Sequence, residues 1–209
     1  LLGYSASFTG LAFLPATAMI AIFAAPSGSV TDRRGPRLQL VAGPLLLGAA
    51  LVVMIVGARI ESFYAFWLPV ILLFGGGMVF LVPAVTKAAL LVPQRYSGAA
   101  SGFNNAAARV AGLLAVTILG AALNTAYQAT LPGALPEALP PETRLAIIED
   151  AGRLLSAELP EEISSAVRPA VESARREAFA LGARVALAVS ATAALAAGEL
   201  AGASGADVQ

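Results

Sequence analysis

A charged stretch between two long apolar runs is the first feature whose residue types suggest chemistry. It runs from Gly28 to Arg37 and reads GSVTDRRGPR, while Leu1–Thr31 and Leu38–Ala58 carry no charged side chain. An acid and several arginines beside apolar segments can form ion pairs, contact helix ends or fix the side of the membrane on which they lie. We expect Asp32 near the start of the following helix, where unpaired backbone N–H groups favour a negative charge.

An arginine inside an apolar segment is the second candidate. Arg109 lies in the run 97–126, shortly after Asn104 and Asn105. Asn105 is one helical turn before Arg109 and faces the same way. Because a cation at membrane depth is costly, it normally faces the bundle interior, forms a pair or reaches the headgroups. We hypothesise that the two asparagines and Arg109 line a cavity or a gate. The alternative is that Arg109 reaches the inner headgroups or supports helix packing.

The composition indicates an all-α, polytopic membrane protein. Of the 209 residues, 58% are hydrophobic and only 12% are charged, about half the share usual in soluble domains. The formal net charge is zero, so no nucleic-acid partner is predicted. The absence of cysteine and histidine removes disulfides, thiolate metal sites and the commonest general base. No nucleophile–base pair is visible either, so we predict no enzyme activity, no catalytic residue, no metal site and no cofactor.

The apolar runs predict five membrane-spanning helices, since each approaches or exceeds the roughly 20 residues that cross a hydrocarbon core. Their ranges are 2–30, 38–57, 63–87 and 97–126, within the segment 1–126, and then 178–200. Prolines at positions 15 and 26 are expected to kink the first helix. The last is the weakest, because Arg184 interrupts it about one and a half turns from its outer end. That side chain is expected to reach the interface.

A change of composition separates the fourth predicted helix from the fifth. Segment 127–177 is rich in proline, and acids alternate with arginines in it. We predict a long extracytoplasmic loop with short amphipathic helices at Thr143–Leu159 and Pro160–Arg176. Residues 201–209 would then form a cytoplasmic tail.

The charges of the short loops predict the orientation. Basic residues on the predicted inner side outnumber the single Arg59 outside, and they are Arg33, Arg34, Arg37, Lys87 and Arg95. Because cytoplasmic loops are enriched in lysine and arginine, the chain is expected to begin outside and end in the cytoplasm. The predicted location is the lipid bilayer of a bacterial inner (plasma) membrane.

The charged stretch also carries a family resemblance. Its pattern G-x-x-x-D-R-x-G-x-R resembles the cytoplasmic loop signature of the major facilitator superfamily of secondary transporters. Together with Gly102-Phe103-Asn104-Asn105, Arg109 and Gly112, it makes the chain most similar to the C-terminal part of an EmrB/QacA-like, fourteen-span drug:proton antiporter. Pro36 departs from the pattern, because the family usually has a basic residue there. The resemblance covers about residues 3 to 126, and the remainder only by topology.

The resemblance implies a C-terminal half-bundle of this fold, with one further span before Leu1. The first, third and fourth predicted helices would line the central cavity, and the other two would brace it. The signature residues would form a gate latch, and they are Gly28, Asp32, Arg33, Arg34, Gly35 and Arg37. In this reading the acid contacts a basic group or a helix end in one state only. The alternative is that the charges merely keep the loop inside.

Apolar side chains on the first and third predicted helices suit a binding wall. Bulky amphipathic or cationic drugs bind mostly apolar pockets with few polar points. The candidates are Phe13, Phe23, Phe74, Met78 and Phe80. Such residues can equally well face lipid or a neighbouring helix.

The predicted spans contain no acid, since Asp32, Glu61 and Glu199 all lie at their ends. Proton-coupled transport needs a titratable group in the membrane, so the carrier carboxylate is expected in an N-terminal half outside this sequence. The implied function is efflux of multiple drugs or other small amphipathic compounds by proton antiport, through alternating access. Two alternatives stay open. One is a transporter of this fold for a sugar, peptide or lipid precursor, and the other is a non-transporting membrane scaffold or receptor with a degenerate transporter fold.

Overall fold

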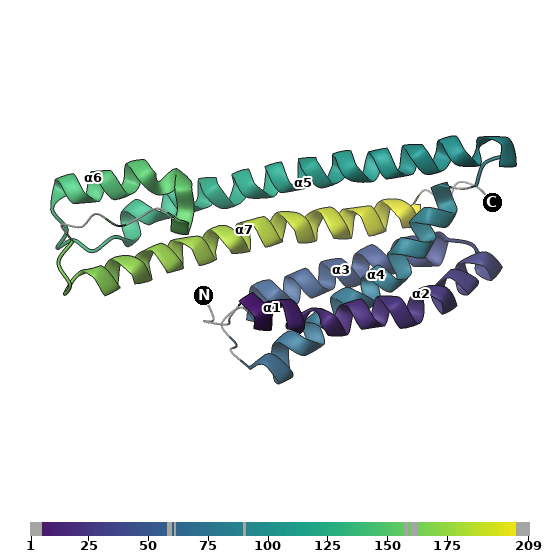
Figure 1. The fold of residues 1–209 in the computed structure, drawn as a ribbon, viewed down its shortest axis with the longest axis horizontal. Coiled ribbons are helices and arrows are strands. Elements are labelled where there is room, and N and C mark those ends of the chain that lie inside the picture. Colours follow the sequence, from purple (N-terminus) through teal and green to yellow (C-terminus); the bar gives the residue numbers. More distant parts are fainter. Residues whose placement is uncertain are drawn as a thin grey trace. The chain divides into compact units, whose positions relative to one another are not determined.

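The structure is a computed structural model that describes residues 6–57, 60, 62–89, 91–156, 159 and 163–203. Over these residues it contains helices and no strand (Figure 1). The helices are α1 (Ala6–Ala12), α2 (Leu14–Arg34), α3 (Arg37–Gly57), η1 (Phe63–Trp67), α4 (Leu68–Ala89), η2 (Gln94–Tyr96), α5 (Ser97–Ala134), α6 (Pro141–Glu149), η3 (Asp150–Ser156) and α7 (Arg168–Ala203).

Five helical stretches in the described part of the chain are long and apolar enough to cross a membrane. They are Gly10–Arg34, Arg37–Gly57, Phe63–Ala89, Gln94–Ala134 and Arg168–Ala203. Helices suit this setting because they satisfy their backbone hydrogen bonds internally. The predicted all-α, polytopic fold class is therefore confirmed.

Several helix ends differ from the sequence-based bounds. The first predicted helix is interrupted at Phe13, just before Pro15 in the first turn of α2, and α2 continues to Arg34. Proline is favourable in a first turn, because the N–H it lacks has no intrahelical partner there. Residues 1–5, the outer-side Arg59 with Glu61, and 204–209 of the predicted tail lie outside the described residues.

Helix α5 ends eight residues later than predicted, at Ala134 rather than at position 126. Arg144 of α6 stabilises this end, because its guanidinium donates to the carbonyl of Pro132 in the last turn of α5 at 3.0 Å and to the carbonyls of Leu135 and Pro136 just beyond it at 3.1 and 2.8 Å. The last carbonyls of a helix have no partner within it, and a cation there is favourable. A side chain from the following helix thus caps α5 beyond its proline.

Helix α7 begins at Arg168, ten residues before the predicted position 178. The second amphipathic helix expected at Pro160–Arg176 is, where described, mainly the first turns of α7. Arg184 therefore lies roughly four turns from the start of α7. The helix therefore begins further from Arg184 than predicted, while the distance of Arg184 from the outer end of the membrane span stays a prediction. The Nε atom of Arg184 is buried and has no hydrogen-bond partner among the described residues.

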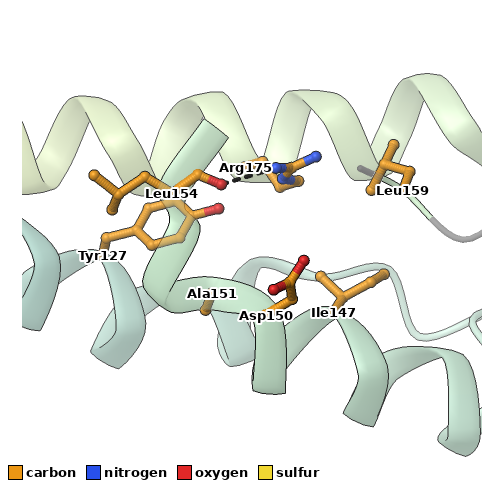
Figure 2. Close-up of a pocket in the computed structure, with 7 residues that line it drawn as sticks. All are labelled: Tyr127, Ile147, Asp150, Ala151, Leu154, Leu159 and Arg175. Carbon is orange, nitrogen blue, oxygen red and sulfur yellow. Dashed lines mark hydrogen bonds between the residues drawn. The ribbon is translucent and has the colours of Figure 1, made fainter. Parts of the chain in front are cut away.

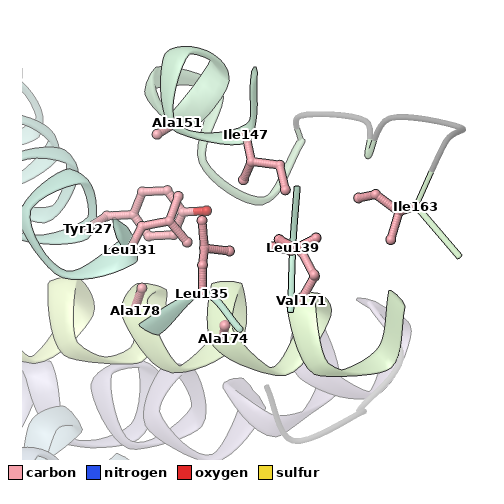
Figure 3. Packing of buried hydrophobic residues seen from close by; sticks show 10 residues of the cluster. All are labelled: Tyr127, Leu131, Leu135, Leu139, Ile147, Ala151, Ile163, Val171, Ala174 and Ala178. Atoms are coloured by element: carbon pink, nitrogen blue, oxygen red, sulfur yellow. The ribbon is translucent and has the colours of Figure 1, made fainter. Parts of the chain in front are cut away.

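The chain divides into two compact units. The middle unit is Ala115–Leu187, and the N-terminal unit is the chain up to Leu114 together with the segment from Ala188. The middle unit has its own apolar core (Figure 3), whose residues are Tyr127, Leu131, Leu135, Leu139, Ile147, Ala151, Ile163, Val171, Ala174 and Ala178. At Gly182 of α7 this unit brings two backbones together, since an added Cβ would lie 2.6 Å from the carbonyl oxygen of Leu123.

Glycines allow α4 to pack closely against α2 and α3 in the N-terminal unit. A Cβ at Gly75 would lie 3.0 Å from the Cα of Ala16, and one at Gly77 would lie 3.0 Å from the carbonyl oxygen of Gly43. In lipid, the hydrophobic effect does not drive helices together, because the surrounding tails are as apolar as the side chains. Close packing of this kind is therefore a main source of helix association. The glycines of α4 thus determine how near its neighbours come.

We predict that valine at Gly75 or Gly77 lowers the free energy of unfolding by about 1–3 kcal/mol, because the new atoms meet backbone. Thermal unfolding of the purified full chain in detergent measures this effect. Gly76→Val is the matched control, since its nearest neighbour is the end of the flexible Met19 side chain at 3.9 Å. Equal losses at all three positions would contradict this packing.

Candidate functional site

The signature residues form the end of one helix and a very short turn. Gly28 to Arg34 belong to α2, and only Gly35 and Pro36 separate it from α3. Gly35 has φ 78° and ψ 166°, a conformation open almost only to glycine. The turn therefore depends on this glycine, whereas Gly28 has ordinary helical surroundings, with Pro83 Cβ 4.0 Å from where its own Cβ would be.

Asp32 forms an ion pair with Lys87, with Oδ1 and Nζ 2.6 Å apart. Asp32 lies in the last turn of α2, so the expected position near the start of the next helix is wrong. Carbonyl groups make a helix C-terminus unfavourable for an acid, and a cation nearby offsets this. Lys87 supplies that cation from the last turn of α4. The pair is solvent-accessible, with side chains 62% and 43% exposed.

The arginines of the signature stretch have different surroundings. Arg37, the first residue of α3, donates through Nη2 to the carbonyl oxygen of Gly202 at 3.3 Å, in the last turn of α7. Arg33 and Arg34 are exposed in the last turn of α2, where positive charge is favourable. Contacts from the signature residues therefore reach the C-terminal ends of both α4 and α7.

Sequence reasoning missed a buried polar cluster beside the signature. Ser27, Thr31 and Gln39 are at most 6% exposed and are hydrogen-bonded to one another. Gln39 is the only strongly polar side chain of the apolar run 38–58. Its position in an otherwise apolar run could have indicated a hydrogen-bonded cluster, because a buried amide needs a partner.

The asparagine and arginine candidates lie on the first half of α5. Asn105 and Arg109 are exposed, and Asn104 is partly buried. Helix α5 has no buried residue before Tyr127. No contact in the described part of the chain assigns these side chains a partner, so their role in a cavity or a gate stays a prediction.

The five apolar candidates for the substrate wall differ in their surroundings. Phe13, Phe23 and Phe80 are exposed, and Phe74 and Met78 are partly buried. At about 100° per residue, α4 places Phe74 and Met78 on one face and Phe80 on another. Ring pairs among the described aromatic residues join Phe8 to Phe63 and Phe66 to Trp67 instead. The substrate wall remains a prediction.

A small pocket lies in the middle unit (Figure 2), and none of the residues that line it was predicted as a site residue. Its lining residues are Tyr127, Ile147, Asp150, Ala151, Leu154, Leu159 and Arg175. The buried Arg175 donates to the carbonyl oxygen of Leu154 at 2.8 Å and supports a residue with φ 55°. The cavity volume of the pocket is about 10 Å³, roughly the room that one water molecule needs and far below that of ordinary ligand sites. It is a packing feature of this unit.

Among the described residues, no group of three or more histidine, cysteine, aspartate or glutamate side chains could hold a metal ion. The polar groups of the candidate site are instead engaged at helix ends. The arrangement can hold helix ends together through contacts that water can replace.

These features define a multi-pass α-helical membrane protein. The chain is similar to the multidrug resistance protein Stp from two strains of Mycobacterium tuberculosis, with 33% identity over 139 residues in each case. The match covers 66% of this chain and 26% of the relative. The chain thus spans about a quarter of the length of the curated relatives it matches. No family model and no solved structure matches it.

We predict that Gly35→Ala destabilises the chain by about 1–3 kcal/mol, because a Cβ strains the backbone at this φ and ψ. Gly28→Ala is the matched control and should be neutral or slightly stabilising, since alanine is the better helix former. Thermal unfolding in detergent compares the two. A Gly35→Ala variant as stable as Gly28→Ala would contradict the turn geometry.

Proposed function

We propose that this chain is part of a secondary active transporter of the major facilitator type. It exports drugs or other small amphipathic compounds in exchange for protons, by alternating access. The observation that carries the proposal is the similarity to a multidrug resistance protein over two thirds of the chain. The five apolar helices and the signature residues at the ends of α2 and α3 agree with it.

The Asp32–Lys87 pair suits a gate that opens in every cycle. An ion pair as exposed as this one contributes at most about 1 kcal/mol, because water competes for both charges. A contact of this strength biases one conformation without locking it. We therefore propose that the pair closes the cytoplasmic ends of α2 and α4 in one state and separates in the other.

The polar face of α5 suits the wall of a water-filled pathway. Asn105 and Arg109 lie one turn apart on a helix that must cross lipid, and Leu114 lies about 180° around it from Asn105. Polar groups at membrane depth face a cavity or protein rather than hydrocarbon. Asn105 and Arg109 are thus proposed to face the substrate pathway, with Asn104 beside them.

The proton carrier is proposed to lie in another part of the transporter. In the described residues of α1 to α5, Asp32 is the only acid, and it stands at a helix end. The aromatic candidates would supply the apolar side of the drug pathway. The membrane is proposed to be the bacterial inner membrane, with the signature turn on the cytoplasmic side.

The first test is efflux of ethidium from cells that produce the full-length protein. We expect export that a protonophore abolishes, and Asp32→Asn or Lys87→Met should reduce the rate about two- to fivefold, as expected for an exposed pair. The exchanged pair Asp32→Lys with Lys87→Asp should recover most of the loss. Asp150→Asn is the control, because it breaks another exposed ion pair, with Arg153 at 3.4 Å. Export that survives the protonophore would refute proton antiport.

The second test uses single cysteines, since the 209 residues contain none. A cysteine at Arg34 should react with an impermeant thiol reagent only from the cytoplasmic side. A cysteine at Asn105 should react with a small hydrophilic reagent at least about tenfold faster than one at Leu114, because a thiol in hydrocarbon stays protonated. Labelling of position 34 from outside alone, or equal rates at 105 and 114, would overturn the orientation or the pathway assignment.

A further inference from the structure

The buried cluster of Ser27, Thr31 and Gln39 lies directly beside the proposed gate. Its side chains are 6%, 1% and 3% exposed. Thr31 precedes Asp32 in the last turns of α2, and Gln39 lies in the first turn of α3. The cluster therefore links the two helices across the turn at Gly35.

Both ends of the Gln39 amide are occupied. Nε2 donates to the hydroxyl of Ser27 at 2.9 Å and to the carbonyl oxygen of Ser27 at 3.0 Å, and Oε1 accepts from the hydroxyl of Thr31. Satisfied polar groups in a dry environment stabilise one arrangement, because every alternative leaves a group without a partner. The cluster selects one relative position of α2 and α3.

Gln39 is the member of the cluster that joins α2 to α3, and no bond within α2 can replace that link. The Thr31 hydroxyl also lies 3.1 Å from the carbonyl oxygen of Ser27, one turn earlier in its own helix. If Gln39 were removed, Thr31 would keep that local bond, but nothing polar would join α2 to α3 here.

The other neighbour of α2 is the helix that carries Lys87. Gly28 faces Pro83 of α4, since a Cβ added at Gly28 would lie 4.0 Å from the Cβ of Pro83. Lys87 follows Pro83 by one helical turn. With α2 against α4 on one side and hydrogen-bonded to α3 on the other, the rotation of its last turn is determined. That rotation decides whether Asp32 points toward Lys87.

We propose that Gln39 is a positioning residue of the gate. Through Ser27 and Thr31 it holds the last turn of α2 in the rotation that brings the Asp32 carboxylate to the Lys87 ammonium group. The proposal rests on the proposed function in assigning this pair to a gate. The geometric part, that Gln39 aims position 32 at position 87, can be tested without transport.

The experiment places cysteines at Asp32 and Lys87 of the full-length protein, with no other cysteine, and bridges them in membranes with a short bifunctional thiol reagent. We expect Gln39→Leu to slow bridging about three- to tenfold, the worth of one or two hydrogen bonds. Ser27→Ala should slow bridging less, because Nε2 of Gln39 still donates to the backbone carbonyl oxygen at position 27. Gln128→Leu is the control, since it makes the same chemical change at an exposed residue and should leave the rate unchanged.

A second readout separates positioning from general stability. In ethidium efflux, Gln39→Leu should reduce the rate in the parent protein but add nothing to Asp32→Asn, because it acts through that carboxylate. Additive losses, or unchanged bridging in Gln39→Leu, would overturn the proposal. If Gln39→Leu does not reach the membrane, Ser27→Ala and Thr31→Val decide by the same two criteria. If the parent exports nothing, the proposed function fails while the bridging rates still decide the geometry.

Discussion

The close contact of α4 with α2 and α3 is the constraint on which the N-terminal unit depends. In lipid, the solvent is as apolar as the side chains, so helices associate through packing and hydrogen bonds rather than through burial from water. Gly75 and Gly77 remove the side chains that would hold these helices apart. The approach in the middle of the helices brings their ends near enough for Asp32 to reach Lys87.

Two kinds of polar contact then lie within a turn of each other at the end of α2. The pair between Asp32 and Lys87 is exposed, so water can replace either partner at little cost. The bonds between Gln39 and its two hydroxyl partners are buried, so breaking them leaves desolvated groups. A breakable contact next to a rigid one is a suitable arrangement for a switch. In the proposed gate, the buried bonds would preserve the geometry while the exposed pair opens.

The helix ends show where sequence rules were insufficient. The change of composition at position 127 predicted that the helix had ended, yet α5 continues through Pro132 to Ala134, and Arg144 caps the Pro132 carbonyl in its last turn. Asp32 was expected near the start of the next helix, yet α2 continues past it to Arg34 and ends at Gly35, which among the described glycines has a positive φ. At the end of α5 the stabilising contact comes from another helix, whereas at the end of α2 the break depends on which of two nearby glycines takes a positive φ.

The sequence by itself determined the class of protein. Its long uncharged runs, separated by short charged turns, are long enough to cross lipid as helices, which satisfy their own backbone hydrogen bonds. It also marked the signature residues and Arg109 as charged or polar groups beside or within apolar segments, where such groups normally have a partner or a function. Only the tertiary structure decided the partners of Asp32 and Arg37, two of these signature residues. The pairing of Asp32 with Lys87, of Arg37 with Gly202 and of Gln39 with Ser27 depends on which helix faces which. That choice follows from the fit of small residues between helices, a property of pairs of surfaces rather than of any one segment.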